Sequence, residues 1–203
     1  MNRNHRPAPA ASLRCLAGAA LLLVFGACQR DPLERKVSAG TPTAFSVWRS
    51  GIDSDSGPDL RRRVQEALTE IRLKVSGDRE IERLKGDQAA RPASSLDDEL
   101  RARVDGRLLR EVVQLGYELR QRRLEAELAG LEEAMRKNAN LITRPGDVES
   151  RQHLDGLRDR QQARVDQYRL ELVATARELA PLVAQSGRRL LPPEETDAPP
   201  VRR

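Results

Sequence analysis

Apolar residues along this chain recur mainly at helical spacing. The pattern predicts a first helix over residues 59–75, capped by Asp59. Its apolar face is formed, at intervals of three or four, by Leu60, Val64, Leu68, Ile71 and Val75. The turn-forming residues 76–78 are expected to interrupt this helix, with a short continuation to about Lys85 and a loop over 86–94.

A second helix is predicted over residues 95–140, with Ser95 as its N-cap and acids in its first turn. One apolar stripe is formed by Leu100, Val104, Leu108, Val112, Leu115 and Leu119. A second stripe is formed by Leu124, Leu128, Leu131 and Met135. The five-residue step between the two stripes predicts a change of packing partner. Each glycine inside this helix costs about 1 kcal/mol relative to alanine, and they are Gly106, Gly116 and Gly130.

A turn is predicted at Pro145 and Gly146, and Asp147 then caps a third helix that runs to about Gln185. Its heptad positions are Val165, Leu172 and Leu179 in one set and Leu154, Tyr168 and Leu182 in the other. Gly187 is expected to end the helix in the left-handed conformation. The proline-rich segment 187–203 that follows is expected to be a disordered tail.

These elements predict an all-α fold built on a long antiparallel, coiled-coil-like hairpin. The second and third helices bury their stripes against each other over roughly 55–65 Å, and the first helix packs on the base of the hairpin. Charged residues make up 33% of the chain and aromatic residues 2%, which favours an elongated shape over a compact core. Because Arg158 and Gln161 interrupt the seam, we expect self-association or a partner to complete it.

The only sustained apolar run covers residues 16–27 and is too short to cross a bilayer, which takes roughly twenty residues. Arg3, Arg6 and Arg14 precede it with no acidic residue, and small residues follow. This order is typical of a secretory signal peptide. We therefore expect residues 1–27 to be removed from the mature chain.

The end of that run, Val24-Phe25-Gly26-Ala27-Cys28, resembles the lipobox of bacterial lipoproteins. The resemblance covers about the first 28 residues, and Phe25 stands where leucine is commonest. It implies cleavage between Ala27 and Cys28, and lipid attachment to the sulfur of Cys28. An ordinary secretory signal is the alternative. No family resemblance is identified for the mature part.

Removing residues 1–27 takes away three arginines and no acid, so the net charge of +5 falls. Arginine alternates with acidic residues along the rest of the chain. A nucleic-acid binder carries a basic patch or stripe, and none is expected here. Nucleic acid is therefore not a predicted partner.

Residues 28–58 contain glycine, proline and serine in proportions that favour a flexible, lipidated tether. Within this segment Phe45-Ser46-Val47-Trp48 holds the only tryptophan. Two interpretations remain open for it. It is a short extended piece that docks on the helices, or an anchor through Trp48 for a partner or for the membrane interface.

The mature chain contains few residues suited to catalysis or metal binding. Cys15 leaves with the signal peptide, Cys28 is the lipid attachment point, and His153 is the only histidine left. A solvated helix-face histidine is the favoured interpretation of His153. The acids at 97–99 and 132–133 are interpreted as structural. We predict no catalytic residues, no metal site and no cofactor.

The densest basic cluster within a helix is formed by Arg120, Arg122 and Arg123. It is either a solvated face paired with Glu118 and Glu125, or a contact site for an acidic partner such as lipid phosphate or glycan. The second interpretation makes these arginines, together with Trp48, candidate partner contacts.

The expected function is a non-catalytic, membrane-anchored envelope lipoprotein that serves as a helical scaffold or assembly component. A holdase-like periplasmic chaperone or accessory factor is the alternative. The partners are the membrane, through lipid on Cys28, and an envelope protein or a second copy of the chain. Because residue 29 is glutamine and not the aspartate that retains lipoproteins at the inner membrane of enterobacteria, we expect the outer membrane, facing the periplasm.

Overall fold

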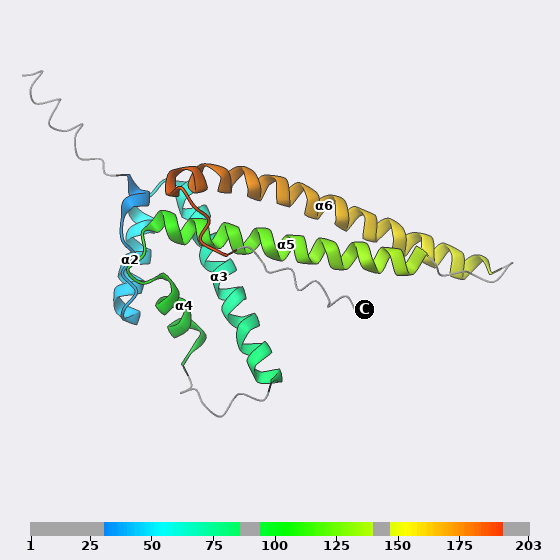
Figure 1. The fold of residues 1–203 in the computed structure, drawn as a ribbon, viewed down its shortest axis with the longest axis horizontal. Coiled ribbons are helices and arrows are strands. Elements are labelled where there is room, and N and C mark those ends of the chain that lie inside the picture. Colours follow the sequence, from blue (N-terminus) through cyan, green and yellow to red (C-terminus); the bar gives the residue numbers. More distant parts are fainter. Residues whose placement is uncertain (1–30, 86–93, 140–146, 193–203) are drawn as a thin grey trace, which may run out of the picture.

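The protein is an all-α structure built on one long antiparallel hairpin (Figure 1). The computed structural model describes residues 31–85, 94–139 and 147–192. The two arms of the hairpin are α5 (Leu109–Ala139) and α6 (Val148–Ser186), which pack along each other. The predicted fold class, a helical hairpin with a shorter N-terminal helix, is confirmed.

Further helices gather at one end of the hairpin, which we call the base (Figure 1). They are α2 (Pro42–Asp55), α3 (Pro58–Leu84) and α4 (Leu96–Val104), preceded by the 3-10 turn η1 (Pro32–Glu34). Helix α3 crosses α5 at the base and also packs on α4. The opposite end of the hairpin, which we call the arm tip, projects beyond this cluster.

The hydrophobic core lies where α3, α4, α5 and α6 meet in the base. Every residue in the range 112–118 of α5 is buried, so α5 is enclosed on all sides there. Ile71 of α3 and Val104 of α4 are fully buried, and Leu179 of α6 is 2% exposed. Burial of such side chains contributes about 1.5–3 kcal/mol each. The base therefore holds most of the buried apolar side chains of the described residues.

Three predicted caps are confirmed, and one is wrong, because Gly57 and not Asp59 is the N-cap of α3 and no side chain caps that end. Ser95 and Asp98 form a capping box at the start of α4, and the Asp147 side chain accepts a hydrogen bond of 3.0 Å from the Ser150 amide at the start of α6. Gly187 ends α6 in the left-handed region, with φ of 70°. These ends are defined by local chemistry, which a sequence pattern can identify.

The seam between α5 and α6 follows the predicted heptad. Val165, Leu179 and Leu182 are each 2% exposed, and Leu124 of α5 is fully buried. Closer to the arm tip the seam residues, Leu154 among them, are only half-buried. Two helices alone cover less of each other's surface than the helices clustered at the base do. Packing along the arm is therefore weakest towards the tip.

The predicted tether over 28–58 is wrong for its described part. Residues 42–55 form helix α2, which starts with Pro42 at its first turn and with Thr41 accepting a hydrogen bond of 3.1 Å from the Ala44 amide. Proline at this position favours helix initiation. Burial of Ile52, which is 4% exposed, outweighs the glycine and serine content of the segment.

The predicted single helix over 95–140 is also wrong, because α4 and α5 are separated by a break at residues 105–108. Gly106 adopts φ of 72° there, a backbone conformation that favours glycine. The Val37 amide donates to the Arg107 carbonyl at 2.8 Å, and the Gly106 amide donates to the Val37 carbonyl at 2.9 Å. The N-terminal segment thus satisfies the backbone groups that the break exposes.

Helix α3 continues through residues 76–78, where an interruption was expected. Val75 is fully buried just before this point. The Asp78 carboxylate lies 2.9 Å from the Lys74 ammonium one turn earlier and 2.9 Å from the Arg103 guanidinium of α4. Packing and these contacts offset the cost of glycine in a helix, which is about 1 kcal/mol. The predicted end near Lys85 is correct.

The predicted disordered tail is wrong for residues 187–192, which turn back along α5. The Leu190 and Leu191 amides both donate to the Glu118 carboxylate. We call this segment, residues 187–192, the strap. Residues 193–203 lie outside the described part of the chain.

Candidate functional site

The predicted lipid attachment residue Cys28 and the cleavage residue Ala27 lie outside the described residues, as does the whole predicted signal peptide. The description begins at Asp31, and the first described residues lie at the base (Figure 1). Three peptide steps separate Cys28 from Asp31, a reach of at most about 11 Å. A membrane anchor at Cys28 would therefore hold the base, and not the arm tip, next to the bilayer.

Trp48 lies on α2 and stacks on Phe45, with ring centroids 5.6 Å apart and planes 9° from parallel. Both side chains are half-buried and pack against the core. The docking interpretation of this segment is confirmed, although the segment is helical and not extended. Trp48 serves to attach α2 to the base, which leaves only part of its surface for a partner.

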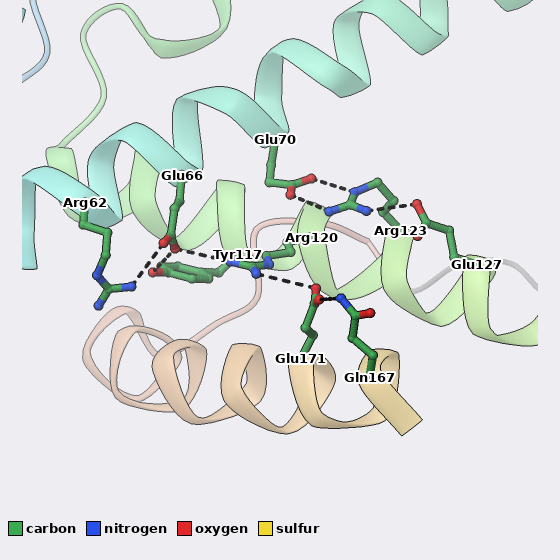
Figure 2. Close-up of polar contacts among 9 residues, drawn as sticks. All are labelled: Arg62, Glu66, Glu70, Tyr117, Arg120, Arg123, Glu127, Gln167 and Glu171. Carbon is green, nitrogen blue, oxygen red and sulfur yellow. Dashed lines mark hydrogen bonds and ion pairs between the residues drawn. The ribbon is translucent and has the colours of Figure 1, made fainter. Parts of the chain in front are cut away.

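Arg120 connects three helices at the junction drawn in Figure 2. Its guanidinium lies 3.3 Å from the Glu66 carboxylate of α3 and 3.8 Å from the Glu171 carboxylate of α6. The Tyr117 hydroxyl donates to the same Glu66 carboxylate at 3.1 Å, and Arg62 adds an ion pair of 3.1 Å. Arg120 therefore holds α3, α5 and α6 in register.

Arg123 makes the most enclosed ion pair of this junction (Figure 2). It donates two hydrogen bonds to the Glu70 carboxylate, at 3.0 and 2.7 Å, and a third to Glu127 at 2.9 Å. The Glu70 side chain is 10% exposed. A two-pronged arginine–carboxylate contact of this kind is geometrically specific and stronger than a neutral hydrogen bond. It fixes the crossing of α3 over α5.

The charges at the junction stabilise one another. The hydrogen bonds to Glu70 raise the pKa of the Arg123 guanidinium above its usual value, although burial acts in the opposite direction. Burial raises the pKa of the Tyr117 hydroxyl, and the nearby Glu66 carboxylate raises it further. Tyr117 therefore remains a neutral hydrogen-bond donor at neutral pH, and Arg123 remains charged.

The arginine cluster is thus engaged inside the molecule. Arg120 and Arg123 pair with α3, and Arg122 donates to the Pro192 carbonyl of the strap. The acids expected to pair with the cluster have other partners: Glu118 accepts from the strap, and Glu125 accepts from Gln121 at 2.8 Å. The cluster therefore joins helices within the chain, and contact of these arginines with lipid phosphate or glycan stays a prediction.

The acidic groups considered for catalysis also have structural contacts. Asp97 pairs with Arg72 at 3.1 Å and Glu132 pairs with Arg169 at 2.9 Å. His153 is exposed on α6, as the sequence predicts. Within the described ranges, no group of three or more histidine, cysteine or acidic residues could hold a metal ion. None of the helices described here combines the length and apolar character needed to cross a membrane.

A shallow groove of about 340 Å³ runs between α3 and α5, beside the strap. Its apolar lining residues include Leu73, Ile81 and Leu191, and its charged lining residues include Lys74 and Arg122. Leu73 and Ile81 are each 50% exposed. This groove is an apolar surface of the base that the sequence pattern did not identify.

Sequence reasoning also missed the polar pair Gln114 and Glu118, which are 0% and 2% exposed. The Gln114 amide donates to Glu118 at 2.8 Å and to the Arg188 carbonyl at 2.8 Å. A signal was present, because apolar residues around this stretch cover more than one face of α5, including Val113 and Tyr117. A helix that is apolar on several sides is buried on several sides.

No protein-family model matches the chain, and comparison with curated proteins and with solved structures finds no significant match.

Proposed function

We propose that this chain is a non-catalytic lipoprotein of the bacterial envelope, anchored by lipid on Cys28, that acts as a helical scaffold or assembly component. The observation that carries the proposal is the position of the described N-terminus at the base, opposite the arm tip. Helix α6 comprises 39 residues and is about 58 Å long at 1.5 Å per residue, and the part of it beyond the base forms the arm together with α5. An anchor at the base leaves that arm available for a partner in the periplasm.

The chemistry of the described surface supports a role in contact and not in catalysis. Acids and arginines at the helix junction satisfy one another, as Glu66 and Arg120 do. Val148, near the arm tip, is 62% exposed. Isolated exposed apolar residues are common on soluble proteins, so contacts of the arm with a partner are tested at Val148.

The alternative is a holdase-like chaperone, and the groove between α3 and α5 favours it. Leu73 and Ile81 present apolar surface there, and charged residues also line the groove. Such a surface could hold an extended apolar segment of a client. A scaffold is expected to contact one or a few defined partners, whereas a holdase contacts many different client proteins.

The anchor is tested by Cys28→Ser in the full chain. We expect the variant to lose all incorporation of a palmitate analogue and to leave the outer-membrane fraction, because the serine hydroxyl does not accept the diacylglyceryl group in place of the thiolate. The measurement is labelling in growing cells followed by membrane fractionation. Normal labelling of the variant would show that the lipobox interpretation is wrong, and recovery of the unchanged chain at the inner membrane would contradict the assignment based on Gln29.

The contact role is tested by a photo-crosslinking residue placed at Val148 in the full chain. Val47 on α2, which is 68% exposed against 62% for Val148, is the matched position at the base. A scaffold is expected to give one discrete product of fixed mass from the tip position. A continuous range of products from both positions would favour the holdase, and no product from Val148 would contradict the arm as the contact surface.

A further inference from the structure

Helix α6 carries a second stripe, with large apolar residues at its centre, on the side that faces away from α5. Leu170 and Val173 are 72% and 69% exposed. Leu172, which belongs to the inner seam, lies about 200° around the helix from Leu170 at 100° per residue. The outer residues therefore pack on nothing in the described structure.

This outer stripe has the spacing of a second coiled-coil seam. Steps of three and four residues connect its members, and all of them are exposed. The central part of the stripe consists of Ala163, Asp166, Leu170, Val173, Arg177 and Ala180. A helix with a heptad seam on each of two opposite sides can bind two helices, and α5 covers only one of these sides.

Two opposite charges lie at equal distances on either side of the centre of the outer stripe. Asp166 lies four residues before Leu170, and Arg177 lies four residues after Val173. Asp166 accepts one hydrogen bond, from Gln162 at 2.9 Å. Arg177 is exposed and makes no ion pair with the described part of the chain. A second α6 running in the opposite direction would set Leu170 against Val173 and Asp166 against Arg177 at both ends.

We propose that the outer stripe of α6 binds the same stripe of a second copy of this chain, antiparallel, about a two-fold axis next to residues 171 and 172. The apolar pairs are Leu170 with the partner's Val173, and each is flanked by Asp166 with the partner's Arg177. Self-complementarity of one surface is what a two-fold interface needs. The inference rests on the proposed scaffold function only in that it names a second copy as one of the scaffold's partners.

The same features favour a second copy over a membrane surface. Asp166 and Arg177 within the stripe cancel in charge, so the stripe has no net attraction to anionic lipid headgroups, whereas in the antiparallel pair each residue meets its opposite charge. Ala163 would meet the partner's Ala180, and small residues allow the helices to approach closely. A two-fold axis also keeps both bases at the same height along the axis, so both chains could be anchored in one membrane.

Disulfide cross-linking in intact cells tests the pairing and its direction. Two full-length copies with different tags are expressed together, one with D166C and the other with R177C, and the cells are then oxidised. A mixed dimer is expected. The control pair is R164C with R177C, and no mixed dimer is expected from it. Arg164 is exposed but lies about 120° around α6 from Leu170, away from the outer stripe. D166C alone should not link to itself, since its two copies would be offset by about 16 Å along the helix, beyond the roughly 7 Å reach of a disulfide.

Reversal of the charges at Asp166 and Arg177 tests the same interface through the affinity of the two copies for each other. In the detergent-solubilised full chain, D166R or R177E alone is expected to weaken the dimer at least about tenfold, because like charges then face each other. The double variant D166R/R177E is expected to restore it. Sedimentation velocity over a range of protein concentrations measures the dimer affinity of the single variants and of the double variant. A monomer at all concentrations, self-linking of D166C, or no recovery in the double variant would each overturn the proposal. If the unchanged chain incorporated no palmitate analogue, the lipid anchor would be wrong, whereas the evidence for the dimer would be unaffected.

Discussion

Gly116→Ala is expected to lower the free energy of unfolding by about 2 kcal/mol or more, although alanine is the better helix former. A Cβ atom at Gly116 would lie 2.3 Å from the Ala67 Cα atom and 2.4 Å from its Cβ atom. Both atoms belong to α3 and neither can rotate away. The two helices would have to separate at the point where Glu66 and Glu70 bind α5. Chemical denaturation of the full chain measures the change.

Gly130→Ala on the same helix is the matched control. Gly130 is exposed, and an added Cβ atom would meet nothing within 4 Å. Alanine there is expected to raise the free energy of unfolding by about 1 kcal/mol, which is its intrinsic advantage over glycine in a helix. Opposite signs for the two substitutions would confirm the close crossing of α3 and α5. A stabilising Gly116→Ala would contradict it.

Sequence spacing treats Gly116 and Gly130 alike, as two residues that weaken one helix, and only the position of α3 separates them. The local signals at three helix ends were reliable, whereas the turn signal at residues 76–78 was not. Ser95 and Asp147 start their helices, and Gly187 ends its helix, where the chemistry of their own side chains or backbone predicts. Such ends depend on residues within one turn.

The errors concern contacts between residues far apart in the sequence. Residues 42–55 have the composition of a linker, and helix α2 forms because Ile52 and Phe45 find the core of the base. The break at Gly106 exchanges backbone hydrogen bonds with Val37, about 70 residues earlier: the Gly106 amide donates to the Val37 carbonyl, and the Arg107 carbonyl accepts from the Val37 amide. Periodicity within one segment carries no information about such partners.

The candidate site shows the same division. The arginine cluster at 120–123 is correctly located on a helix near the step between its two apolar stripes. Its partners Glu66, Glu70 and Glu171 come from other helices. A charge pattern alone does not distinguish a surface that binds a partner from one that joins the helices of its own chain. The lipid anchor is different, since it was inferred from a local motif around Cys28.

Glu118→Gln is expected to lower the free energy of unfolding by about 2 kcal/mol and to loosen the strap. The Glu118 carboxylate is 2% exposed and forms no ion pair with the described residues. It accepts from the Leu190 amide at 3.0 Å and from the Leu191 amide at 2.7 Å. Hydrogen bonds to a charged acceptor contribute about 1.5–3 kcal/mol each. In the variant, one of the two oxygens becomes an NH₂ group, which cannot accept a hydrogen bond and faces either the Leu191 amide or the Gln114 side-chain amide group.

Hydrogen exchange at the Leu190 and Leu191 amides measures the local effect. A loss of about 2 kcal/mol corresponds to roughly 30-fold faster exchange there, while the Leu124 amide within α5 should change less. Glu125→Gln is the control, because Glu125 is exposed and its contact is one hydrogen bond of 2.8 Å from Gln121. That substitution should alter stability by less than about 0.5 kcal/mol. Similar exchange rates in the two variants would mean that the strap is held by Leu191 in the groove and not by the buried carboxylate.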